Sequence, residues 1–349
     1  MAITEPVYAN RESVKRALDI MDTARANDQV DRLLGSATES VDGQLNRTFS
    51  PRIDTLEWDW LNPSSPTPWR LWLDDRELIE VLSLTSGGAA ISTGNLVLYP
   101  NSGPPYNRVE IDISTTSSFS VGSTHQNAIS LHGLFGYTLS LQSVGGLVSA
   151  INSSVGSIEL PNGALVGVGD LLKADDEYLL VTERGWVDST QNLQSPALTA
   201  SVSNTTLAVT TGTSFNMNEV ILLDSERMLI VDVAGNNLTV KRAWDGSVLA
   251  AHIGSDIYWS RSLTVLRGSV GSTAASHLIS TPVKRWLPPP LVNQLCIAEA
   301  LTGIEQEKSA YARVVGSGDN AFEGRGIGLA DLRDMTCKRH GRHNRHRAV

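Results

Sequence analysis

Cysteine is nearly absent from this chain: Cys296 and Cys337 are the only two among 349 residues. Two cysteines are too few for a disulfide framework or a cysteine-ligated metal cluster, so the sequence predicts neither. No run approaches the roughly 18 uncharged apolar residues that a membrane-spanning helix needs. The first residues also lack the apolar core of a signal peptide. We therefore expect synthesis in the cytoplasm and no membrane span.

Motifs that carry catalysis or bind cofactors are missing as well. The chain contains many serines but no GxSxG turn, which would expose a nucleophilic serine. The glycines between residues 316 and 328 are not followed by the GK[ST] of a phosphate-binding loop. His252 and His277 have no second cysteine or histidine nearby at metal-ligand spacing, which favours a structural role at a strand end. The sequence predicts no enzyme, no cofactor and no metal site.

Acidic residues outnumber basic ones in the chain as a whole outside its C-terminus. The net charge is −9, yet the last twelve residues, KRHGRHNRHRAV, hold five Lys or Arg, three His and no acid. Subtracting this +5 leaves −14 on the rest of the chain. An acidic body argues against nucleic-acid readout, which needs a basic surface. The basic end is either an interaction arm or a solvated terminus.

What the chain does contain is helical periodicity at both ends. Residues 1–50 place apolar side chains three and four positions apart, and PPPLVNQLCIAEALTGIEQEKSAYARVV does the same after three prolines that stop the preceding segment. We predict N-terminal helices within 1–50 and a long helix over 286–315, together forming one bundle. The predicted core of this bundle consists of Leu33, Leu34, Leu295 and Leu301.

The residues between the helical ends follow the pattern of strands. Short apolar runs such as TLEWDWL and ELIEVLSLTSGG are bounded by turn signals, and they predict a β-domain over 51–142. Trp58, Trp60 and Trp69 cluster there with Trp72 adjacent. This clustering favours a β-domain core over a ligand platform.

An internal repeat follows the β-domain. LTVKRAWDGSVLAAH and LTVLRGSVGSTAASH, which start at Leu238 and Leu263, agree at eight of fifteen positions. Upstream, GDLLKADDEYLLVTE matches NEVILLDSERMLIVD, with Glu177 aligned on Glu226. Both copies of the upstream segment precede both copies of the downstream segment in the sequence. The simplest account of this order is that one repeat unit is nested within the other. We predict one β-unit, 190–259, inserted in a loop of its own duplicate, 143–189 with 260–282.

Taken together, these patterns predict an α+β fold. Its parts are a split helical bundle of N-terminal and C-terminal helices and a large all-β insertion containing nested, duplicated β-barrel or sandwich units. Residues 316–349 follow the last predicted helix as an extended basic tail.

The two ends of the chain resemble the head–tail connector adaptors of long-tailed double-stranded DNA bacteriophages. The resemblance rests on ESVKRALDI and DRLLGSATESVDGQLNRTFSP near the N-terminus, and on GIEQEKSAYARVVGSGD and GRGIGLADLRD near the C-terminus. It covers about 50 residues at the start and about 60 at the end. PWRLWLDDRELIEVLSLTSGG and LYPNSGPPYNRVEIDI are similar to β-insertions of larger adaptors.

The resemblance implies a virion protein of the neck, without enzymatic activity. Such adaptors form a ring, commonly of twelve subunits, between the portal protein and a stopper or tail-completion protein, and DNA passes through the ring without sequence-specific binding. Residues 316–349 are implied to dock on the portal or a neighbouring subunit. The implied contact residues are Leu329, Leu332, Arg333, Met335, Lys338, Arg339, Arg342 and Arg345.

A second interpretation belongs to a different class of protein. Duplicated β-modules also suit a tail-fibre or baseplate component that binds a glycan on the host surface. Such proteins usually carry their β-domains at the ends of the chain and often trimerise. Here the β-rich part is interior and both ends are helical or basic, which favours the connector.

Overall fold

The computed structural model describes residues 3–18, 24–60, 67–308, 314–315, 322–323 and 327–342. Its fold is α+β, with helices and large antiparallel sheets. The chain divides into two compact units, which are described separately. The first comprises Met1–Asn46, Leu141–Ser269 and Thr273–Val349, and the second comprises Arg47–Ser140 and Val270–Ser272.

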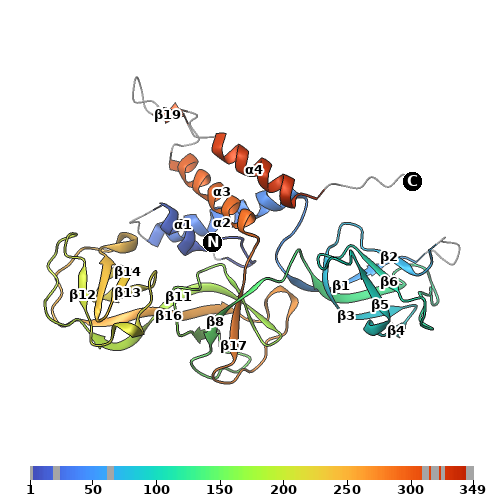
Figure 1. The fold of residues 1–349 in the computed structure, drawn as a ribbon, viewed down its shortest axis with the longest axis horizontal. Coiled ribbons are helices and arrows are strands. Elements are labelled where there is room, and N and C mark those ends of the chain that lie inside the picture. Colours follow the sequence, from blue (N-terminus) through green and yellow to red (C-terminus); the bar gives the residue numbers. More distant parts are fainter. Residues whose placement is uncertain are drawn as a thin grey trace. The chain divides into compact units, whose positions relative to one another are not determined.

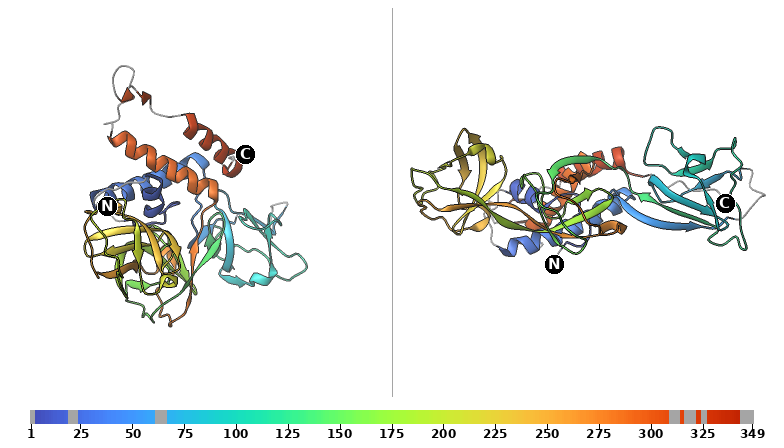
Figure 2. Two further views of the ribbon diagram at one scale, coloured as in Figure 1. Left: turned by 60° about the vertical axis from the view of Figure 1, so that its left-hand side comes forward. Right: turned by 90° about the horizontal axis from the view of Figure 1, so that it is seen from below.

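Among the described residues, four helices from the two ends of the chain meet in the first unit (Figure 1). Helix α3 contacts each of the other three, and Figure 2 shows the group from two further sides. Proline at the first position of α3 suits a helix start, because its missing N–H would have no partner there. The helices are α1 (Arg11–Leu18), α2 (Ala24–Leu45), α3 (Pro290–Lys308) and α4 (Ile327–His340).

The interface between α2 and α3 contains the leucines that the sequence placed in a bundle core. Leu34 and Leu295 are fully buried, Leu33 is 9% exposed and Leu301 is half-buried. The helices approach closely at Gly303, where a Cβ atom would lie 2.9 Å from Leu33 Cδ2. Glycine at this position therefore sets how near the two helices pack.

Two segments near the C-terminus differ from the expectation. The helix expected over 286–315 ends at Lys308 within the described residues, and Val314–Val315 (β18) instead pair with Phe322–Glu323 (β19). The tail expected to be extended contains α4. Its glycine-rich stretch precedes the helix, whereas Leu329, Leu332 and the fully buried Thr336 recur at helical spacing. That spacing gives α4 a face to pack against α2 and α3.

The rest of the first unit is a ten-stranded antiparallel sheet. The strand order is β12-β15-β14-β13-β16-β11-β10-β17-β8, with β9 also paired to β16. The strands are β8 (Leu141–Gly146), β9 (Ser157–Glu159), β10 (Leu171–Ala174), β11 (Glu177–Asn192), β12 (Thr206–Ala208), β13 (Val220–Leu223), β14 (Glu226–Ala234), β15 (Asn237–Lys241), β16 (Asp256–Leu266) and β17 (Pro282–Trp286).

Two long strands connect the halves of this sheet. The N-terminal part of β11 pairs with β10, and its C-terminal part runs on beside β16 to Asn192, opposite Asp256. Strands β12 to β15 lie between these two in the sequence and surround their own apolar cluster, which includes Leu207, Ile221 and Met228. The chain therefore passes along β11 from the half that contains β10 and β17, forms the half that contains β12 to β15, and returns along β16.

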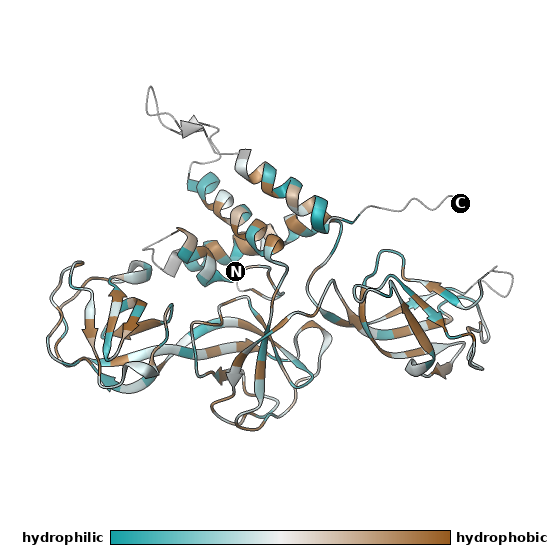
Figure 3. Cartoon of the chain, viewed as in Figure 1, coloured by the Kyte–Doolittle hydropathy of each residue, from teal (hydrophilic) through white to brown (hydrophobic). Residues whose placement is uncertain are grey.

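The second unit covers nearly the same residues as the predicted 51–142 β-domain. Brown and teal segments alternate along its strands in Figure 3, as expected when one face of a sheet packs inward. Trp58, Trp60 and Trp69 pack against its apolar core. Its sheets run β1-β7-β3-β4 and β2-β6-β5, from β1 (Arg52–Trp58), β2 (Arg70–Trp72), β3 (Leu78–Ser86), β4 (Ala89–Ile91), β5 (Leu96–Tyr99), β6 (Arg108–Ile111) and β7 (Ile129–Phe135).

The buried leucines of α2 provide a direct test of the helical packing. We expect Leu34→Ala to lower the free energy of unfolding by about 2–5 kcal/mol, because it removes buried methyl groups and leaves a cavity. Urea denaturation measures this change. Leu82→Ala is the matched control: Leu82 is 44% exposed, and its truncation should change stability by no more than about 0.5 kcal/mol. Wild-type stability in Leu34→Ala would contradict the packing.

Candidate functional site

Helix α4 carries most of the residues predicted to meet a portal or a neighbouring subunit. Met335 is 55% exposed, and Lys338 and Arg339 are exposed too. Positions 335, 338 and 339 are three and four residues apart, so these side chains lie on one side of the helix. Leu329 and Leu332 are half-buried, and Arg345 lies outside the described residues. The exposed part of the predicted interface is therefore a short basic face with one apolar side chain.

Two of the predicted arginines hold α4 in place. Arg333 donates to both carboxylate oxygens of Glu299 on α3, at 2.6 and 2.8 Å. Burial alone would raise the pKa of Glu299, but hydrogen bonds from Arg333 and Gln44 lower it. The backbone N–H of Arg342 donates to the carbonyl of Leu45 at 2.9 Å. Arg333 thus pairs with α3 although its side chain is 44% exposed.

A buried ionic cluster that the sequence analysis did not identify surrounds Glu177. Arg267 donates to both of its carboxylate oxygens at 2.7 and 2.8 Å. The backbone N–H groups of Gly268 and Ala275 donate at 3.0 and 2.9 Å. His277 Nε2 lies 2.9 Å from the same carboxylate. Both oxygens of the carboxylate accept hydrogen bonds, and these bonds hold together the loop between β16 and β17.

The same cluster recurs around Glu226. Arg242 donates to its carboxylate at 2.7 and 2.8 Å, and the N–H groups of Ala243 and Ala250 donate at 2.9 and 3.0 Å. His252 Nε2 lies 2.9 Å away. The alignment of Glu177 on Glu226, with a shared arginine and histidine in the repeat, contained the signal for both clusters. The alignment alone does not show that the glutamate, arginine and histidine of each repeat lie in contact.

Tight hairpin turns supply the last member of each cluster. Ala174 pairs with Glu177 and Leu223 with Glu226, so each turn has two residues and begins with an aspartate at positive φ. The Nδ1 atoms of His277 and His252 lie 2.8 and 2.7 Å from the carboxylates of Asp175 and Asp224. Both ring nitrogens therefore face carboxylates, which supports the structural role expected for these histidines.

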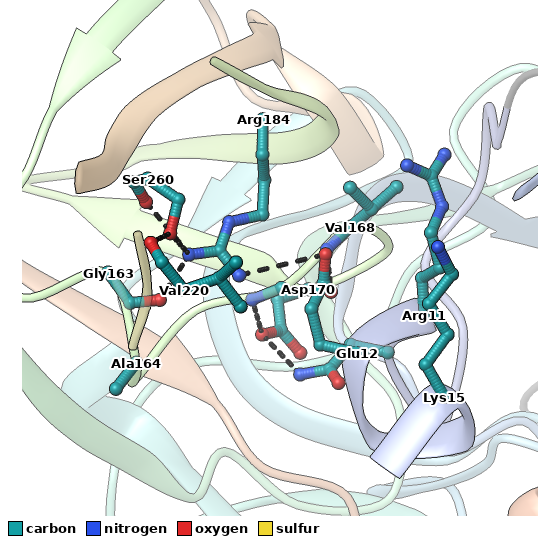
Figure 4. Close-up of polar contacts among 12 residues, drawn as sticks. Arg11, Glu12, Lys15, Gly163, Ala164, Val168, Asp170, Arg184, Val220 and Ser260 are labelled. Atoms are coloured by element: carbon teal, nitrogen blue, oxygen red, sulfur yellow. Dashed lines mark hydrogen bonds and ion pairs between the residues drawn. The ribbon is translucent and has the colours of Figure 1, made fainter. Parts of the chain in front are cut away.

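Helix α1 attaches the helices to the large sheet through a polar network (Figure 4). Glu12 accepts a hydrogen bond from the N–H of Val168 at 2.8 Å, and Asn10 donates to Asp170 at 2.9 Å. Arg184 on β11 donates to the carbonyls of Gly163 and Ser260 at 2.6 and 2.8 Å. These bonds join residues far apart in the sequence, so local periodicity did not predict them.

Arg11 is a buried charged member of this network. It donates to Asp31 on α2 at 2.7 Å and to Glu183 on β11 at 3.2 Å. Burial alone would lower the pKa of Arg11, but these carboxylates raise it, so the guanidinium stays charged. Lys15, one turn further along α1, forms an ion pair with Asp245 beside β14. One helix thus makes ionic contacts with another helix and with both halves of the sheet.

The sites described above are networks of hydrogen bonds and ion pairs among buried and half-buried side chains. Within the described ranges, no three His, Cys, Asp or Glu side chains gather closely enough to hold a metal ion. None of the described helices combines the length and apolar character needed to cross a membrane. Searches against family profiles, curated proteins and solved structures found nothing that matches this chain.

The clusters around Glu177 and Glu226 make the stability of the fold depend on pH. Burial alone would raise the pKa of Glu177 and Glu226, but the arginine, histidine and amide donors lower each from 4.5 to about 2. Because the folded pKa lies below the unfolded value, this stabilisation is complete above about pH 4.5 and is lost as the pH falls toward 2. We expect the free energy of unfolding to decline across that interval, measured by denaturant titration at successive pH values.

Glu226→Gln separates this effect from general acid unfolding. At neutral pH it should destabilise the chain by about 3–5 kcal/mol, since it leaves the fully buried Arg242 without its carboxylate. Between pH 4.5 and 2 its loss of stability should be shallower than that of the wild type. Asp176→Asn, which removes a fully exposed carboxylate, is the control. A Glu226→Gln protein with wild-type stability and slope would show that the cluster contributes nothing.

Proposed function

We propose that this protein is a structural virion component, a head-to-tail connector adaptor of a long-tailed bacteriophage. The observation that carries the proposal is the helical group assembled from both ends of the chain, with the basic face of α4 directed outward. Met335, Lys338 and Arg339 on that face are exposed and would contact a portal protein or a neighbouring subunit. The protein acts by assembly and has no catalytic role.

The domain plan of the proposal has a split helical bundle at its centre. Helices α1, α2 and α3 form the bundle and α4 is its docking element. The large sheet consists of two nested copies of one β-barrel or sandwich unit. The matching clusters around Glu177 and Glu226 support the duplication, and the departure of the chain along β11 with its return along β16 supports the nesting.

The proposed assembly is a ring of twelve subunits, the number common among such adaptors, and it lies below the portal and above a stopper or tail-completion protein. Short helices that pack weakly alone gain stability from lateral burial in such a ring. The body of the chain outside its last twelve residues carries −14. An acidic channel wall would repel the phosphate backbone, so DNA would transit the ring during ejection without sequence-specific binding.

A second candidate function is supported by exposed apolar side chains on the β-units. Ile253 and Leu278 follow the two clustered histidines at equivalent positions and are 83% and 77% exposed. Repeated exposed residues suit a tail-fibre or baseplate protein that contacts a host surface glycan. The connector remains the better supported proposal, because the ends of the chain form helices rather than the β-rich tips expected of a fibre.

The mass of the assembled particle distinguishes the two functions. A twelve-subunit ring of 37.6 kDa chains would have a mass of about 450 kDa, and a trimer about 113 kDa. We expect light scattering of the purified protein at high concentration to give the larger mass, and electron microscopy to show closed rings. A trimer would support the fibre candidate, and a monomer at all concentrations would contradict ring assembly.

A further inference from the structure

A cavity of about 130 Å³ lies between α1 and the large sheet, apart from the surfaces considered above. Its walls come from α1, the start of α2, the middle of β11, the β13–β14 hairpin and the loop that contains Trp244 and Asp245. Eight of the sixteen lining residues are charged. Five are cations (Arg11, Lys15, Arg16, Arg184 and Arg227) and three are carboxylates (Glu12, Glu183 and Asp245).

Each carboxylate in the cavity wall already has donors. Glu183 accepts from Arg11 through both oxygens, at 3.2 and 3.3 Å. Asp245 accepts from Lys15 through one oxygen and from Arg227 through the other, the latter at 2.7 Å. Glu12 accepts the N–H of Val168 at 2.8 Å. The negative charge in the wall is therefore committed to neighbouring groups.

Two of the five cations, Arg16 and Arg227, keep unused donors. Among the described residues, the nearest hydrogen-bond partner of the Arg16 guanidinium is the hydroxyl of Ser13 on its own helix, at 3.5 Å, and no carboxylate lies within ion-pair distance. Burial lowers the pKa of Arg16, and the nearby carboxylates of Glu12 and Asp170 offset this only in part. Toward the described part of the chain, Arg227 donates through Nη1 alone, which leaves its Nε and Nη2 groups for a ligand. A wall with spare donors, occupied acceptors and excess positive charge favours an anion.

Apolar surface lines another part of the cavity. Trp186 is 36% exposed, whereas Trp244 and Leu229 are 5% and 9% exposed. Such a wall limits the water that competes for the cations and strengthens their attraction for a negative group. Guanidinium groups present paired N–H donors, which match the oxygens of phosphate and carboxylate groups.

We propose that this cavity binds an oxyanion, a phosphate or carboxylate group, through the free donors of Arg16 and Arg227. The two ligand types share this recognition chemistry and differ in charge. The site is independent of the ring assembly, because its lining residues do not include the exposed face of α4. Its failure would leave the connector proposal untouched.

Calorimetric titration of the full-length protein at fixed ionic strength tests the site, with inorganic phosphate and acetate as separate probes. We expect saturable binding of at least one probe, and at least a tenfold loss of affinity in Arg16→Gln and in Arg227→Gln, since a hydrogen bond to a charged group contributes about 1.5–3 kcal/mol. Tighter binding of phosphate as the pH rises from 6 to 8 would identify a phosphate site, because the dianion then predominates. Equal binding of acetate would identify a carboxylate site.

The control is Arg76→Gln, which removes an arginine with a 59% exposed side chain in the second unit. It should bind the probes with wild-type affinity. Two variants on different elements keep the test decisive if one of them fails to fold. Absence of saturable binding of both probes would overturn the proposal, as would wild-type affinity in folded Arg16→Gln or Arg227→Gln protein.

Discussion

The buried guanidinium of Arg11 is the interaction on which the first unit depends. A chain whose helices lie at its two ends must bring those ends together across a long β-rich insertion. Arg11 is 4% exposed and contacts Asp31 on α2 and Glu183 on β11 at once. A buried charge is tolerated only where its partners are in place. Helix α1, helix α2 and the sheet must therefore assemble together or not at all.

The half of the sheet that contains β12 to β15 is attached to α1 by the loop after β15, through the carboxylate of Asp245. Ala243 and Asp245 both have positive φ, at 52° and 55°. In the aligned repeat, Val270 occupies the position of Asp245 and has a similar φ of 48°. The backbone conformation is thus shared, but only Asp245 supplies a carboxylate, which pairs with Lys15 and Arg227. One substitution within a common loop converts it into an ionic attachment to α1.

Features of the fold that depend on local periodicity were predictable from the sequence. Leu34 and Leu295 are buried as their helical spacing indicated, and the α+β class follows from the change of period near residue 51. Helix α4 was not predicted because the segment before it is rich in glycine and its own amphipathic pattern is short. The polar sites were missed for another reason. Asn10 and Asp170 are 160 residues apart, and Lys15 and Asp245 are 230 apart. No local pattern specifies which distant charges will pair.

Hydrogen–deuterium exchange resolved by segment tests the role of Arg11 most directly. Arg11→Met keeps the length of the side chain but leaves Asp31 without its buried partner. If Arg11 joins the helices to the sheet, the substitution will lower amide protection in α2 and α3 and in β10 and β11 together. Protection that falls only in the helices, while β10 and β11 exchange as slowly as in the wild type, would contradict this account.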